Sequence, residues 1–285
     1  MTALSTFMKS VREQPWRLWS VQVWTIVRLD LKRNLLTWRA SWVYFLAFAP
    51  TVIMILHALV DRNRHSMSED MRIFAGIFQF YYVRLGIFFG TLGIFTRLIR
   101  GEMVERSLHY YLLAPVRREV LLVGKFVAGA VRALVIFESA VYIGFMAMYM
   151  HFGAAGEQYI FDGPGQFEMF SYLGITALAC MAYGSIFLLF SMLLKNPTPL
   201  ALLLMAWEAI SSILPAFLQK FSVASYLRQL MPVSVPGEGI FALLTVNVEP
   251  VPGAAAVLGV LLLTTAVVAV SCYRIRTLEI SYTTE

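Results

Sequence analysis

Residues 100–125, RGEMVERSLHYYLLAPVRREVLLVGK, form a charged segment between two long apolar segments, and the rest of the chain is organised around them. Read as a helix over residues 101–113, the segment has two distinct faces. One face carries Glu102, Glu105, Arg106 and His109, and the other carries Val104, Leu108, Tyr111 and Leu112. Pro115 ends this helix, because proline lacks an amide hydrogen and disfavours helical geometry at the preceding residue. Spacing alone leaves two interpretations open: a helix that docks on a soluble partner, or a loop that lies on lipid headgroups.

The composition is typical of a membrane protein. Hydrophobic residues make up 59% of the 285 residues and charged residues 14%, against roughly 45–50% and about 25% in soluble domains. The apolar residues gather in six runs, which leaves no room for a large soluble domain. The basic residues behind the net charge of +6 flank these runs, as expected for contact with anionic lipid. No basic patch interleaved with aromatic residues indicates a nucleic-acid partner.

The apolar runs predict an all-α membrane protein with six transmembrane helices. The predicted spans are residues 40–60, 71–98, 120–150, 169–194, 200–218 and 254–273. Helices of this length cross about 30 Å of hydrocarbon at a rise of about 1.5 Å per residue. Residues 219–253 contain four prolines and apolar pieces too short to cross, so we expect short outer re-entrant or surface helices there.

Residues 1–39 combine basic side chains with four tryptophans and fit a helix in the membrane interface from Pro15 onward. This helix either braces the first span and touches a partner or serves as a plain anchor. The chain then divides into this N-terminal segment, a six-helix membrane domain at residues 40–276, and a short tail at residues 277–285.

The distribution of Lys and Arg predicts the orientation. Sixteen of the 23 basic residues lie in the N-terminal segment, the charged segment, the turn at Lys195 and the C-terminal end, and five lie on the other side. Because the basic side faces the cytoplasm, we expect both termini and the charged segment to be cytoplasmic. The predicted location is a bacterial inner (plasma) membrane, which the chain crosses several times.

Three charged residues, Arg84, Glu138 and Glu208, lie deep inside predicted spans. A lone charge at the bilayer centre costs at least about 2.5–3.5 kcal/mol on insertion scales. One interpretation is an interhelical pair of Arg84 with Glu138 or Glu208. The other is a polar lining of a translocation path.

Motifs of enzymes are missing from the sequence. Gly124 and Lys125 are followed by Phe126 and lack the upstream glycine of a phosphate-binding loop, so we expect no ATP site in this chain. Zinc-protease and nucleophile-elbow motifs are also missing. The run Met146, Met148, Met150, His151 has ligands for copper. Alternate positions of a helix do not share a face, however, so flexible packing is the preferred interpretation, and we expect no cofactor or metal.

The charged segment resembles the cytoplasmic loop of type-2 ATP-binding-cassette (ABC) permeases. That loop has an acidic residue, a small residue plus Leu, a Leu pair, Pro, Arg and then an apolar run that reaches a Lys. The matching residues are Glu102, Ser107, Leu108, Leu112, Leu113, Pro115, Arg118 and Lys125. As a pattern of spans, the resemblance extends over residues 39–276.

The resemblance implies that residues 101–114 are a coupling helix that seats on a separate ATPase subunit. The residues it assigns to coupling are Gly101, Glu102, Glu105, Arg106, His109, Arg117 and Arg118. It implies two permease copies, identical or closely related, with two ABC ATPase subunits that bind ATP and Mg²⁺. The family mostly exports, so we expect efflux of a hydrophobic or amphipathic substrate such as a drug or lipid. The alternatives are a proton- or ion-coupled secondary transporter that uses Glu138 and Glu208, and a membrane-embedded enzyme.

Overall fold

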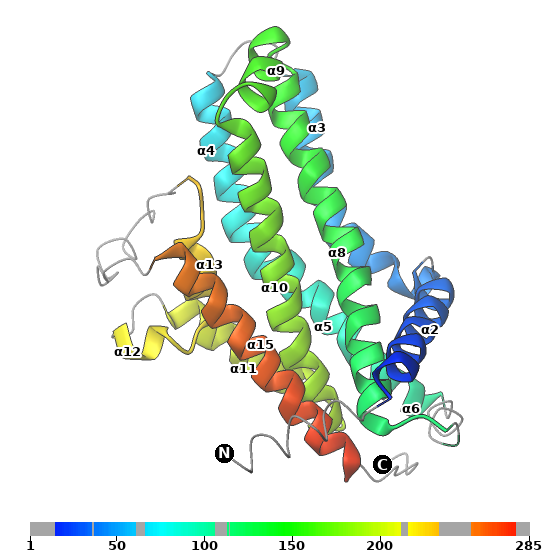
Figure 1. Cartoon of the computed structure of the whole chain (residues 1–285). Helices are drawn as coiled ribbons and strands as arrows, with labels where there is room; N and C mark the ends of the chain where they lie inside the picture. The colour runs from blue at the N-terminus through cyan, green and yellow to red at the C-terminus, as the bar shows by residue number, and fades with distance from the viewer. Residues whose placement is uncertain are drawn as a thin grey trace.

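A computed structural model describes residues 15–35, 37–60, 66–105, 113, 115–211, 216–233 and 252–277. Within these residues the chain folds into helices joined by short turns, without any strand. The all-α class is therefore confirmed. Figure 1 shows long helices running side by side, with shorter helices at both ends and on one flank.

Among the described residues, five helices are long and apolar enough to cross a membrane. They are α3 (Ser41–Val60), a continuous helix over Met67–Val104, α8 (Arg118–Met150), α10 (Gly165–Leu193) and α15 (Gly253–Arg276). The Met67–Val104 helix comprises α4 (Met67–Ile77), η2 (Phe78–Ile87), α5 (Phe88–Thr96), η3 (Arg97–Gly101) and α6 (Glu102–Val104). The chain thus has the architecture of a multi-pass membrane protein. Five of the six predicted spans correspond to long helices.

The span predicted at residues 200–218 differs from the structure. Its described part is α11 (Thr198–Ile210), a helix of 13 residues, which covers only about 20 Å. The short helix α12 (Ala216–Gln219) follows it. Then comes α13 (Val223–Gln229), which packs against α10 and α15 about halfway along the bundle (Figure 1). The six-span layout therefore stays a prediction.

Aromatic side chains fill the core between the Met67–Val104 helix, α8 and α10. Phe95 is fully buried and lies between two glycines, Gly129 of α8 and Gly184 of α10. A Cβ atom at Gly129 would lie 2.8 Å from the Phe95 ring, and one at Gly184 would lie 2.4 Å from it. Small residues let membrane helices approach closely, so these glycines set the separation of three helices around one ring.

The helix predicted from Pro15 is confirmed as α2 (Trp16–Asn34). It packs along the first turns of α8, where Ile26 lies against Gly124. In Figure 1, α2 and α6 lie at the same end of the bundle as the C-terminal end of α15. Trp16 and Trp24 on its other face remain exposed, which suits a place in the membrane interface.

The opposite end of the bundle carries a buried carboxylate. Asp70 of α4 is fully buried between His57 of α3 and His151 at the end of α8, with N–O distances of 3.3 and 3.4 Å. The helix α9 (Ala154–Phe161) follows and covers this end (Figure 1). It lies between the third and fourth predicted spans.

Candidate functional site

The structure of the charged segment differs from the prediction at Gly101, the first residue of the predicted helix. No new helix begins at Gly101: the second membrane helix continues through Gly101 to Val104. The turn η3 before it is π-helical, a geometry that is frequent at functional sites. The continuation has a simple cause, since no Pro stands between residues 98 and 104, and a single glycine such as Gly101 is tolerated inside a helix. Arg106 and His109 lie outside the described residues.

Glu102 belongs to a buried cluster of three charges. The Lys125 Nζ of α8 lies 2.5 Å from Oε1 of Glu102 and 3.2 Å from Oδ1 of Asp30 on α2. The exposed fractions of these side chains are 1% for Lys125, 9% for Glu102 and 2% for Asp30. The shared ammonium ion therefore joins three helices that are far apart in sequence. The Glu102 carboxylate therefore points to the protein interior, whereas Glu105 is exposed.

Two other charged residues of the segment contact α2. The Glu105 carboxylate receives a hydrogen bond of 3.1 Å from Arg33 in an exposed ion pair. The Arg117 guanidinium lies 4.9 Å from the ring centre of Trp19, within the range of a cation–π interaction. These contacts hold α2 against both sides of the charged segment.

Arg118 connects the segment to the last membrane helix. Its guanidinium donates to the carbonyl oxygens of Arg276 at 3.1 Å and Ile275 at 3.4 Å. A second link joins Arg276 Nε to the Glu119 carboxylate at 2.6 Å. A cation at a helix C-terminus stabilises the unpaired carbonyl groups there. The charged segment is therefore attached to α2, α8 and α15.

Asp30 was missed by the sequence analysis, and Lys125 was noted only as the end of a motif. A signal for Asp30 exists, because Ile26, Val27 and Asp30 share one face of an amphipathic helix at spacings of three and four. Lys125 likewise stands between buried residues of α8. A buried charge in each of two segments indicates a pair, but the sequence does not say that the two segments meet.

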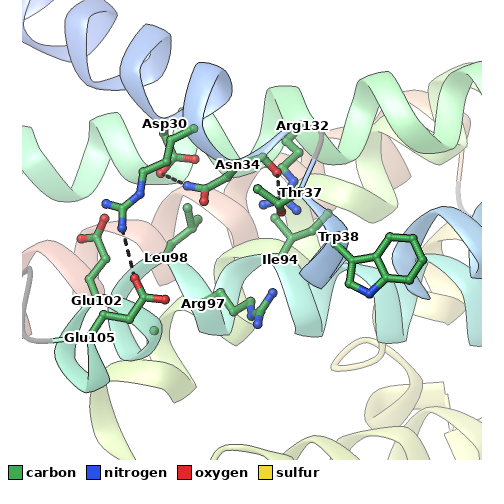
Figure 2. A pocket seen from close by; sticks show the side chains of 12 residues that line it. Asp30, Asn34, Thr37, Trp38, Ile94, Arg97, Leu98, Glu102, Glu105 and Arg132 are labelled. Atoms are coloured by element: carbon green, nitrogen blue, oxygen red, sulfur yellow. Dashed lines mark hydrogen bonds and ion pairs between the residues drawn. The ribbon is translucent and has the colours of Figure 1, made fainter. Parts of the chain in front are cut away.

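A cavity of about 410 Å³ opens beside this cluster, between α2, the end of the second membrane helix and α8. Figure 2 shows the side chains that line it, among them Asp30, Arg97, Glu102 and Arg132. Arg132 of α8 is only 4% exposed. Its Nε atom has no hydrogen-bond partner in the described part of the chain.

The three charges inside the predicted spans are not paired with one another in the part of the chain that the structure describes. The Arg84 guanidinium lies over the Phe80 ring, 5.6 Å from its centre. Glu138 is half-buried on α8, and no described residue donates a hydrogen bond to its carboxylate. The predicted ion pair of Arg84 with Glu138 or Glu208 is not formed.

Glu208 instead binds the first turn of α13. Its carboxylate accepts hydrogen bonds from the Ser222 hydroxyl at 2.6 Å and from the amides of Val223 and Ala224 at 3.0 and 2.9 Å. The group is 6% exposed. Carboxylates are favourable at helix N-termini, where amide hydrogens lack partners. Glu208 thus attaches a short helix to the bundle.

No group of three or more His, Cys, Asp or Glu side chains within the described ranges is placed to hold a metal ion. In a comparison with known proteins, no family model matches the chain, and no curated protein matches it. The resemblance to type-2 ABC permeases is therefore a hypothesis carried by residues of this chain.

Proposed function

We propose that this chain is the membrane subunit of an ATP-driven transporter of the type-2 ABC permease class. A separate ATPase subunit docks on residues 101–114 and carries ATP and Mg²⁺. In this proposal the chain is not an enzyme. It forms the path of the substrate through the membrane and transmits the motion of the ATPase to the membrane helices. Six membrane helices, with both termini in the cytoplasm of a bacterial cell, complete the proposed topology.

The attachment of the charged segment to three helices is the observation that carries the proposal. Glu102 is joined to α8 and α2 through Lys125, and Arg118 is joined to the end of α15. The helix α8 has 33 residues, about 50 Å of rigid rod. A force applied at the segment reaches the far side of the bundle through that rod. Such a linkage suits the coupling of ATP hydrolysis to a change in the membrane helices.

The proposed assembly contains two permease copies, most simply a homodimer, and two ATPase subunits. We further propose export of a hydrophobic or amphipathic substrate. The test of direction is ATP-dependent uptake of an amphipathic dye into inside-out vesicles, because exporters load such vesicles. Uptake into right-side-out vesicles would contradict export.

Affinity purification of the full chain from its native host in mild detergent tests the partner. The expected result is stoichiometric recovery of a subunit with a phosphate-binding-loop motif. Repeated recovery of the intact permease without any such ATPase would contradict the proposal.

An exposed residue of the segment tests the docking site. Leu113 is 80% exposed, so Leu113→Asp is expected to leave the fold intact and to abolish recovery of the ATPase. The matched control is Phe161→Asp in α9, 63% exposed at the opposite end of the bundle. Equal recovery of the ATPase with both variants would refute docking at residues 101–114. Glu102→Arg is a poor test, because it places a second cation against buried Lys125.

A secondary transporter driven by protons or ions is the second candidate. The half-buried Glu138 favours it, because a carboxylate inside a membrane is costly and often marks a proton path. This candidate predicts transport by the purified chain alone in a proton gradient, abolished by Glu138→Gln. ATP-dependent transport that Glu138→Gln leaves unchanged would exclude it.

A further inference from the structure

Two arginines face each other about halfway along the bundle, where η2 packs against α13 (Figure 1). They are Arg84 of η2 and Arg228 in the last turn of α13, and their charges act on each other. Both residues are half-buried, so each keeps accessible surface. Neither guanidinium group forms a hydrogen bond or an ion pair with a described residue. Two like charges therefore lie close together without a bound counter-charge in the described part of the chain.

The depth of Arg84 makes this arrangement costly. Arg84 lies near the middle of the 38-residue helix Met67–Val104, about 25 Å from its first residue and about 30 Å from its last. An arginine near a helix end can extend its charged group into water, but Arg84 is too far from either end. Charged groups at such a depth face a partner or a water-filled path. Guanidinium groups stay protonated in proteins, so loss of a proton does not remove the cost.

The carboxylate of Glu208 offsets only one of the two positive charges. Its charge acts on Arg228, and the charge of Arg84 acts on it. Its two oxygens accept three hydrogen bonds from the beginning of α13, however, and form no ion pair with either arginine. One negative charge thus stands against two positive ones. The guanidinium N–H groups are left without an acceptor among the described residues.

We propose that Arg84 and Arg228 bind the anionic headgroup of an amphiphile. Guanidinium groups bind phosphate and carboxylate groups through charge-assisted hydrogen bonds, and two of them on separate elements hold one anion from two sides. The Phe80 ring, whose centre lies 5.6 Å from the Arg84 guanidinium, is 44% exposed. It offers apolar surface to a hydrocarbon tail next to the bound headgroup. The site does not depend on the proposed transporter function.

Binding is measured on the full chain, purified in a neutral detergent and depleted of lipid. The probes are oleyl phosphate and oleyl alcohol, which share one hydrocarbon tail and differ in the anionic group. Each is titrated while thermal unfolding is recorded, and bound molecules are counted by native mass spectrometry. The variants are Arg84→Gln and Arg228→Gln. The control is Arg72→Gln, which removes the same charge from an exposed position near the beginning of the same membrane helix.

The expected result is that oleyl phosphate stays bound and raises the unfolding temperature, and that oleyl alcohol does neither. Each of the two arginine variants should weaken the binding of oleyl phosphate about tenfold or more, as expected for the loss of a hydrogen bond between charged groups. The control variant should bind oleyl phosphate like the parent chain.

Inside-out vesicles that contain the chain and its proposed ATPase partner identify the source of the anion. ATP-dependent uptake of oleyl phosphate that Arg84→Gln abolishes and Arg72→Gln preserves would make the anion a transported substrate. Binding without such uptake would make it the headgroup of a resident lipid, and phosphatidylglycerol should then displace oleyl phosphate. Because binding is measured without ATP or a partner, a failure of the transporter proposal leaves this test intact.

Equal binding of oleyl phosphate and oleyl alcohol, or equal weakening by Arg72→Gln, would overturn the proposal. Binding of oleyl phosphate to Arg84→Gln or to Arg228→Gln as tight as to the parent chain would also overturn it. If one of these two variants does not fold, the other decides the question by the same criterion.

Discussion

Replacing Lys125 by Met tests whether the buried charge cluster holds the charged segment in place. Methionine has a similar length and removes only the charge and the hydrogen bonds. Asp30 and Glu102 then lose the cation between them, and both carboxylates stay at least nine-tenths buried. Removing one partner of a buried ion pair costs about 3–5 kcal/mol, because the remaining charge is uncompensated. Two facing carboxylates place the expected cost at the upper end of this range.

The assay is thermal unfolding of the full chain in one detergent, followed by the loss of monodisperse protein on heating. One kcal/mol corresponds to roughly 2–4 °C for chains of 150–250 residues. At about 5 kcal/mol, the expected decrease in unfolding temperature is therefore about 10–20 °C. The matched control is Lys195→Met in an exposed turn, which should change stability by less than about 0.5 kcal/mol.

A triple variant separates the charge from the packing. Asp30→Asn and Glu102→Gln, combined with Lys125→Met, leave no charge in the cluster and keep each side chain close to its original volume. Neutral replacement of a complete buried ion pair is often tolerated, so the triple variant should recover most of the lost stability. The reasoning is refuted if Lys125→Met unfolds with the parent chain, or if the triple variant is no more stable than the single one.

Three further substitutions test the packing of the bundle. Glu208→Ala should release α13, seen as faster proteolysis within residues 216–233 while the unfolding of the remaining bundle changes little; unchanged proteolysis would contradict the role of Glu208 as a helix cap. Gly184→Val should destabilise the bundle by about 1–3 kcal/mol through overpacking, because a Cβ atom there would lie 2.4 Å from the Phe95 ring. The control is Gly174→Val, because Gly174 has open space around it. Asp70→Leu should lower the unfolding temperature, because two partly exposed histidines lose the buried carboxylate between them. A stability equal to the parent's would argue against an electrostatic role.

Much of the fold follows from the sequence, because membrane spans depend on local composition. The first, third, fourth and last predicted spans match α3, α8, α10 and α15 to within a few residues. The second begins earlier than predicted, at Met67, where Ser66 and Glu69 form a capping box. That motif is visible in the sequence, but the predicted span left out these polar residues.

The predicted span at residues 200–218 illustrates a limit of composition. The run is apolar enough to cross, but α11 stops at Ile210, just after Glu208. This carboxylate binds the amides of α13, and Ser211 joins the same hydrogen-bonded group through Ser222. A composition score gives each residue its own cost in lipid, whereas Glu208 is bound by amides that come 15 and 16 residues later in the chain.

The candidate site shows the same limit for the prediction of charged contacts. Spacing placed Glu102 with Glu105 on one charged face, and only Glu105 is exposed. The difference arises from Asp30 and Lys125, whose positions are 72 residues before and 23 residues after Glu102. Helical periodicity predicts which residues of one helix share a face, but it does not predict which other helix that face meets.

The separation of these three charges in sequence also bears on how the charged segment could move. A rotation of α2, α8 or the second membrane helix by one residue would remove a charge from the cluster and leave it buried without a partner, at a cost of several kcal/mol. The cluster therefore selects one register among the three helices and resists sliding between them. A displacement of residues 101–105 is accordingly expected to carry α2 and the first turns of α8 with it as one body, and to concentrate bending farther along the bundle. Double electron–electron resonance between labels on α2 and on the first turns of α8 should show one unchanged distance with and without the proposed ATPase partner in its nucleotide-bound form. A change in that distance would refute the single body.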